Sequence, residues 1–241
     1  MYAEAYRRGY DRVVAFMEDR DPEIRVPACP EWTAADVVRH LAGISSDMVE
    51  GVVEGFASEE WTQRQIDALA DVSFDEVLVR WASTIDVASE RLDDMESVGD
   101  AERVPSALGM VPTSALGAMA ISDILHHEFD LRNTYGDRSG RDLMDIHFAA
   151  AGHVRSLRGP FSAYDLPTIR VESVDSGMGW DIGRGDPAAT LRAPSFQIMR
   201  GIGGRRTRGE MIALGWEGDP DPFVDAMVLP HLAMRETSLR E

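Results

Sequence analysis

The spacing of apolar residues changes character near residue 140. Before that point apolar side chains recur every three or four residues, as from Val77 to Leu92 through Trp81, Ile85 and Ala88, which places them on one helical face. Farther along, "PTIRVESV" alternates apolar and polar residues, as half-buried strands do. We therefore predict an α+β fold, with a helical domain over residues 1–140 and a small α+β domain over 141–241.

Local signals predict four long helices in the first part. The first covers residues 2–18, the second follows Thr33, the third opens at Ser73, and the fourth runs from Thr113 to Gly136. "TAAD" and "SFDE" match the capping box, Pro112 precedes the fourth helix, and Gly136 suits its C-cap. A short segment, "SEEWTQRQI", predicts a further turn of helix. Four apolar stripes are buried together by packing as a four-helix bundle.

The second part is predicted to mix short strands with helices. A helix over residues 143–157 comes first. Strands are expected at "PTIRVESV", "MGWDIG", "AATLRA" and "EMIALGWEG", and helices at "PSFQIMRGI" and "DPFVDAMVL".

Charge and composition exclude several classes of function. The formal net charge is −18, and such a field repels phosphate backbones and anionic lipid headgroups. We therefore expect no nucleic-acid or membrane partner. All 24 basic residues are arginine, which excludes a Schiff-base lysine. The single cysteine, Cys29, forms no internal disulfide, and no apolar run approaches the roughly 20 residues of a membrane span. The expected localisation is cytoplasmic.

The stretch "ISDILHHEFD" carries the candidate chemistry. Asp123 and His127 are four residues apart, so both project from one helical face and can bind one ion. His40 lies on the inward stripe of the second helix and is the natural third ligand. Two imidazoles and a carboxylate leave one position open around a divalent ion, which is typical of catalytic sites. Alternatively, Asp123 and His127 form an ordinary exposed pair.

The neighbouring residues are given lesser roles. His126 points about 100° away from His127, so it is expected to lie at the surface or to support a ligand, and Glu128 is expected to face solvent. Asp130 is predicted either to accept the other ring proton of His127 or to pair with an arginine. Cys29, in the proline-bounded turn "PACPEW", is expected to be a small buried filler.

Two motifs resemble the mycothiol-dependent maleylpyruvate isomerase family. "VPACPEWTAADVVRHLAGI" is similar to its first signature, in which His40 matches a metal ligand, and "DILHHEFDL" is similar to its second, in which Asp123 and His127 match the others. The family usually has glutamate at position 123. "LRAPSFQIMRGIGGRR" and "EMIALGWEGD" resemble its C-terminal domain. The resemblance implies a DinB-like four-helix bundle followed by a sterol-carrier-like domain.

The same resemblance implies the cofactors. These are a divalent metal, with zinc expected first, and the low-molecular-weight thiol mycothiol, whose sulfur the metal activates. The implied reaction is isomerisation or S-transfer on a small electrophilic substrate. Arg205 lies in an arginine-rich stretch without acidic residues and is the candidate for holding a substrate carboxylate. Metal-assisted hydrolysis and non-catalytic ligand binding remain alternatives, and we expect a monomer or homodimer.

Overall fold

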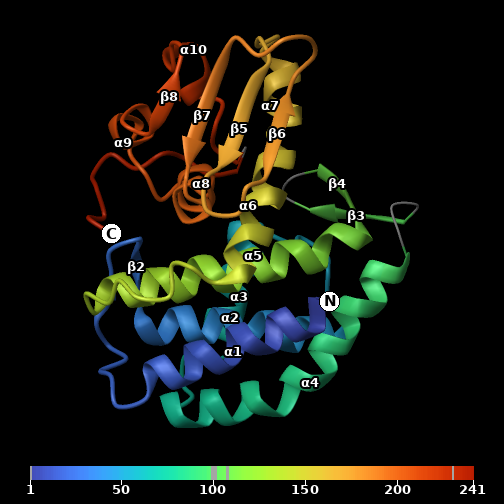
Figure 1. Cartoon of the computed structure of the whole chain (residues 1–241). Helices are drawn as coiled ribbons and strands as arrows, with labels where there is room; N and C mark the ends of the chain where they lie inside the picture. Colours follow the sequence, from blue (N-terminus) through green and yellow to red (C-terminus); the bar gives the residue numbers. More distant parts are fainter. Residues whose placement is uncertain (1, 99–101, 107–108, 230) are drawn as a thin grey trace. The chain divides into compact units, whose positions relative to one another are not determined.

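The computed structural model describes residues 2–98, 102–106, 109–229 and 231–241 (Figure 1). It confirms the α+β fold: helices fill the first part and a four-stranded sheet lies in the second. The chain divides into two units, Met1–Arg138 and Ser139–Glu241. Among the described residues, no helix has both the length and the apolar character needed to cross a bilayer.

The first unit is a bundle of four long helices with a short fifth helix. The long helices are α1 (Tyr2–Met17), α2 (Ala34–Glu50), α4 (Phe74–Val98) and α5 (Thr113–Thr134). The short helix α3 (Glu59–Asp67) packs on α2. Two antiparallel hairpins connect the helices, namely β1 (Arg25–Val26) with β2 (Cys29–Thr33) and β3 (Arg103–Ser106) with β4 (Gly109–Pro112). Neither hairpin was predicted.

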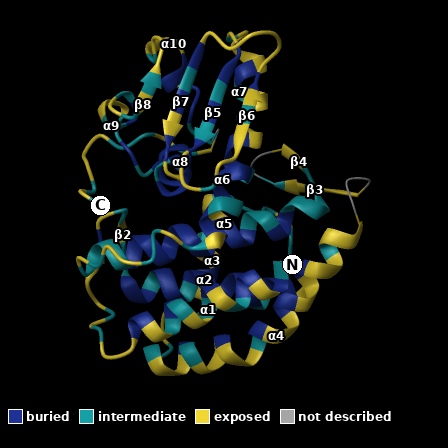
Figure 2. Cartoon of the chain, in the orientation of Figure 1, coloured by how far each residue is buried: buried dark blue, intermediate teal, exposed yellow. Residues whose placement is uncertain are grey.

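Local capping and apolar spacing explain where the helices begin and which face they bury. The Thr33 hydroxyl accepts a hydrogen bond from the backbone N–H of Asp36, whose carboxylate accepts one from the Thr33 N–H, so the predicted capping box is present. Gly51 ends α2 in the left-handed conformation, with φ of 73°. In α4 the predicted apolar stripe is buried, while the remaining faces carry most of its exposed residues (Figure 2).

Helix α5 is buried on nearly all sides. It packs against α1, α2 and α4, so even polar positions on it are enclosed. The expectation that Glu128 faces solvent is therefore wrong. Its side chain is 0% exposed and lies between Arg12, at 2.8 Å, and Arg132, at 3.0 Å. The two guanidinium groups compensate for burial of the carboxylate.

The second unit is built on one mixed sheet in the order β6-β5-β7-β8. Its strands are β5 (Ile169–Ser173), β6 (Gly179–Ile182), β7 (Ala189–Ala193) and β8 (Gly215–Glu217), and only the β5–β7 pair is parallel. The helices are α6 (Met144–Ser156), α7 (Arg158–Ala163), α8 (Ser195–Ile202), α9 (Arg208–Ile212) and α10 (Asp221–Val224). Alternate residues of β5 are fully buried, as its pattern predicted.

The prediction of one strand over "EMIALGWEG" is wrong for its first half. Thr207 and Glu210 form a reciprocal capping box, and the backbone turns into α9 at Arg208. Only the last residues of the segment extend, as strand β8. The capping signal was present in the sequence as "TRGE".

Candidate metal centre

His40, Asp123 and His127 meet inside the helical unit. One donor atom from each lies within 4.8 Å of the others. Nε2 of His40 is 3.4 Å from Oδ2 of Asp123, and Nε2 of His127 is 3.7 Å from Oδ1 of the same carboxylate. Both imidazoles are almost completely buried, whereas the Asp123 side chain is 35% exposed. The cluster therefore has one side that small molecules can approach.

Two helices position the three side chains. Asp123 and His127 stand one turn apart on α5, and His40 comes from α2, which packs against α5. The two imidazole rings are nearly perpendicular, at 83°, with centroids 5.2 Å apart. Facing helices of a bundle commonly build metal sites from such side chains.

Indole rings cover the histidines. Trp32, at the end of β2, has its ring centroid 5.4 Å from that of His40 and 5.7 Å from that of His127. Trp61 on α3 approaches His40 edge-on, at 6.4 Å. The tryptophan of the first signature thus packs beside both imidazoles and limits the directions in which their rings can turn.

A buried hydrogen-bonded chain orients His40. Its Nδ1 lies 2.7 Å from Oε1 of Gln65, and Nε2 of Gln65 donates to Oδ2 of Asp47 at 2.5 Å. Arg64 donates to both carboxylate oxygens of Asp47, at 3.0 and 2.8 Å. Because Oε1 of Gln65 can only accept, Nδ1 of His40 carries the proton and Nε2 presents a lone pair to the cluster. The roles of Gln65 and Asp47 were not predicted from the sequence.

Gly43 permits this arrangement. It lies three residues after His40 on α2, and a Cβ at this position would be 2.5 Å from Cβ of Gln65. Atoms that close would force the helices apart. The absent side chain therefore allows α3 to bring Gln65 within reach of the imidazole.

Asp130 lies on the far side of the His127 ring. Its Oδ2 is 3.3 Å from Nδ1 of His127, and its side chain is 0% exposed. Cys29 is half-buried, and its Sγ lies 3.9 Å from the same Oδ2. Asp130 thus lies beside Nδ1 of His127, but the contact does not have hydrogen-bond geometry. The position of Cys29 beside them was not expected from its place in a turn.

The negative charge of Asp123 also affects a buried tyrosine, Tyr6. Burial, and secondarily the negative charge of Asp123, raise the pKa of Tyr6 on α1 far above its ordinary value. Tyr6 is therefore a neutral phenol at any working pH. Its hydroxyl is buried without a hydrogen-bond partner among the described residues.

The remaining candidates lie elsewhere. His126 is 5% exposed and belongs to neither group of ligand-spaced residues. Arg205, in the second unit, donates to the backbone oxygen of Gly203 at 2.8 Å. The other arginines of its stretch pair with carboxylates: Arg192 with Glu172 and Glu217, Arg200 and Arg206 with Glu241, and Arg208 with Asp221 and Asp225. For these four, structural pairing is the better explanation.

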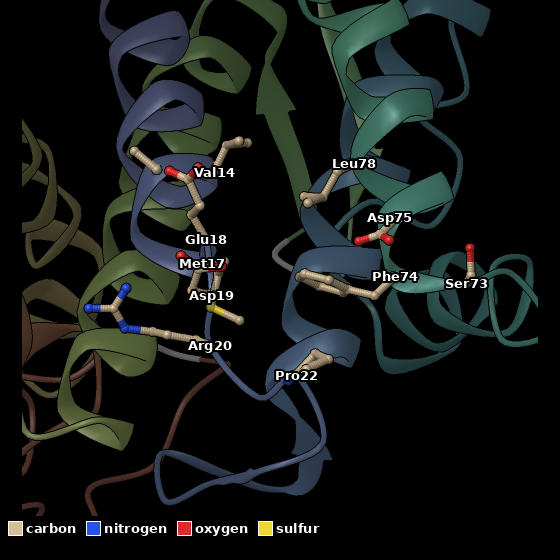
Figure 3. A pocket seen from close by; sticks show the side chains of 11 residues that line it. Val14, Met17, Glu18, Asp19, Arg20, Pro22, Ser73, Phe74, Asp75 and Leu78 are labelled. Atoms are coloured by element: carbon tan, nitrogen blue, oxygen red, sulfur yellow. The ribbon is translucent and has the colours of Figure 1, made fainter.

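A cavity of about 640 Å³ lies between the end of α1 and the start of α4 (Figure 3). Its lining combines apolar side chains, such as Phe74 and Leu78, with the carboxylates Glu18 and Asp75. None of the predicted ligands lines it. Its lining therefore includes no member of the histidine cluster.

Comparison with known proteins gives the family. The sequence matches the mycothiol maleylpyruvate isomerase N-terminal domain over residues 3–132, more than half of the chain. The chain belongs to the mycothiol maleylpyruvate isomerase family. The matched segment contains all three members of the histidine cluster, whereas Arg205 lies outside it. No curated protein matches the sequence.

Solved structures of the same family share the fold. A crystal structure of the mycothiol-dependent maleylpyruvate isomerase aligns with 85% of this chain and 88% of its own, with a TM-score of 0.59 and 15% identity. A mutant of that enzyme aligns with a TM-score of 0.58 and 14% identity, over 84% of this chain and 88% of its own. At such identity the likeness shows a common fold.

Proposed function

We propose that this family member is a metal- and mycothiol-dependent enzyme, an isomerase or S-transferase acting on a small electrophilic substrate that bears a carboxylate. The observation that carries the proposal is the meeting of two imidazoles and a carboxylate within 4.8 Å. Mycothiol is proposed because the solved enzyme with this fold is named as mycothiol-dependent.

The donor set fits a divalent cation. His40 and His127 would each bind through Nε2, and Asp123 would bind through its carboxylate. Zinc is the ion that we expect first, since it commonly takes imidazole and carboxylate ligands and leaves a position for an exogenous group. When bound, such an ion lowers the pKa of a coordinated thiol, so that the thiolate is available at neutral pH.

The chain's own residues prepare the site. Gln65 fixes the ring proton of His40 on Nδ1, and the carboxylate of Asp130 lies 3.3 Å from Nδ1 of His127, on the side of that ring away from Asp123. Trp32 packs beside both rings and restrains them. The exposed part of Asp123 marks the side from which thiol and substrate reach the donors.

The reacting sulfur comes from the cofactor. Cys29 lies beside Asp130, on the Nδ1 side of His127, away from the Nε2 atoms that face Asp123. When bound, mycothiol would supply a thiolate for reversible addition to an activated double bond, which permits isomerisation, or, in the alternative S-transfer, for displacement of a leaving group. Arg205 is proposed to bind the substrate carboxylate through its planar guanidinium.

The test is metal content and thiol binding of the full chain. Wild-type protein purified without added metal should contain about one divalent ion per chain and bind mycothiol in calorimetry. In a Cys29→Ser background, which removes the single cysteine of the chain, His40→Ala should lose both, whereas His231→Ala, which removes an exposed histidine, should keep both. A His40→Ala protein with full metal content and activity would refute the proposal. Turnover without thiol would instead indicate hydrolysis, and ligand binding without turnover a binding protein.

A further inference from the structure

A second group of metal-binding side chains adjoins the first. Sγ of Cys29, a carboxylate oxygen of Asp130 and a ring nitrogen of His127 lie within 4.8 Å of one another. Cys29 begins β2, and the other two residues lie one turn apart on α5. Nδ1 of His127 lies 3.3 Å from Oδ2 of Asp130, and Sγ of Cys29 lies 3.9 Å from the same oxygen.

These separations suit a tetrahedral cation. Around an ion with bonds of about 2.0–2.3 Å, neighbouring donor atoms lie roughly 3.3–3.6 Å apart. A small movement of the Cys29 side chain would therefore complete the geometry. The carboxylate needs no movement, since it already lies at that separation from the imidazole nitrogen.

A buried polar atom points into this space. Nδ1 of His127 is buried and has no hydrogen-bond partner among the described residues, because its contact with Asp130 lacks hydrogen-bond geometry. Buried polar groups usually have a partner, and such an exception calls for an explanation. An ion between Nδ1, the carboxylate and the sulfur would supply the partner, and the half-buried Cys29 leaves it a way in.

We propose that Cys29, His127 and Asp130 form a second cation site, for a thiophilic divalent ion such as Zn²⁺ or Cd²⁺. Sulfur and imidazole together select such ions over Mg²⁺ or Ca²⁺. This site uses Nδ1 of His127, whereas the cluster with His40 uses Nε2 of the same ring. The second site therefore goes beyond the proposed function and does not depend on it. Because one imidazole serves both sites, filling one is expected to weaken the other.

The experiment is Cd²⁺ titration of the reduced, metal-free full chain, followed by the ultraviolet charge-transfer absorption of cadmium–thiolate bonds. We expect the band in wild type and in His40→Ala, where only the second site remains intact. We expect no band in Cys29→Ser. In a His40→Ala background, Cys29→Ser should weaken Cd²⁺ binding by at least about tenfold. Far-UV circular dichroism checks that each variant is folded, and Asp123→Asn replaces His40→Ala if that variant fails.

Two results would overturn the proposal. Absence of the band in reduced wild type would show that the sulfur binds no cadmium. Loss of the band in both His40→Ala and Asp123→Asn would show that the sulfur is a ligand of the first site's ion. A wild-type measurement complements the variants: Cd²⁺ should slow alkylation of Cys29 by iodoacetamide at least about tenfold, and unchanged alkylation would also count against the site. None of these results depends on catalysis.

Discussion

The protonated Nδ1 of His40 lies 2.7 Å from Oε1 of Gln65, and this contact turns Nε2 toward Asp123. The amide is itself held by Asp47, so the orientation of the imidazole depends on a chain of buried hydrogen bonds. Partners of this kind fix the tautomer and direction of a metal-binding histidine.

Replacing Gln65 should therefore weaken metal binding without removing a ligand. For Gln65→Leu we expect the dissociation constant for Zn²⁺ to rise about ten- to a hundredfold, measured by competition with a chromophoric chelator. Gln63→Leu, on the exposed face of the same helix, is the matched control and should leave the constant unchanged. Equal affinities in both variants would show that the buried hydrogen bonds through Gln65 do not support the site.

The carboxylate at position 123 should be required for its charge. Asp123→Asn keeps the size of the side chain but removes its negative charge, so we expect Zn²⁺ affinity to fall by more than about tenfold. Asp123→Glu keeps the negative charge and should keep metal bound. Inductively coupled plasma mass spectrometry after dialysis checks both. Full metal content in Asp123→Asn would exclude the carboxylate as a ligand.

Glu128 should matter for stability. Its fully buried carboxylate holds Arg12 and Arg132, so Glu128→Ala leaves two half-buried cations without their shared partner. We expect the free energy of unfolding to fall by about 3 kcal/mol, measured by urea denaturation. Glu4→Ala, which removes an exposed partner of Arg8, should cost about 0.5 kcal/mol or less. Equal losses would contradict this reasoning.

Stability of the second unit should depend on pH through His153. Burial, then the charges of Arg205 and His231, lower the pKa of His153 from 6.5 to about 4. Between these values the unfolded chain binds a proton that the folded chain does not. The contribution of neutral His153 to the free energy of unfolding is therefore fully present above pH 6.5 and is lost as the pH falls toward 4.

The test is the free energy of unfolding of the second unit, measured by urea denaturation at several pH values. Wild type should lose about 2 kcal/mol between about pH 7 and pH 5 on account of His153. His153→Gln does not titrate and should show a correspondingly smaller loss over this range. Parallel pH profiles for the two proteins would mean that His153 is not buried in its neutral form.

The sequence was most informative where its signals are local. Thr33 and Asp36 are three residues apart, so their capping box, and with it the start of α2, was predictable. The stripe from Val77 to Leu92 likewise gave the buried face of α4. The strand expected at residues 210–218 failed because an apolar run outweighed the capping box at Thr207, which is also local.

The candidate site was predictable only in part. Asp123 and His127 share a helical face by their spacing, whereas His40 was added through the inward stripe and the family resemblance. Gln65 is 25 residues from His40, and Cys29 is 101 residues from Asp130. No periodicity connects such pairs, because their proximity comes from helix packing. For the same reason the burial of Glu128 could not be foreseen from its place on α5.

The arrangement around His40 requires that position 43 has no side chain. The backbone of α2 and the side chain of Gln65 approach so closely that even a methyl group at this position would collide with it. Any larger residue must push α3 outward and take with it the amide that aims the His40 ring. A side chain at position 43, which itself contacts no candidate ligand, is thus expected to weaken metal binding at the proposed site by moving the partner of His40.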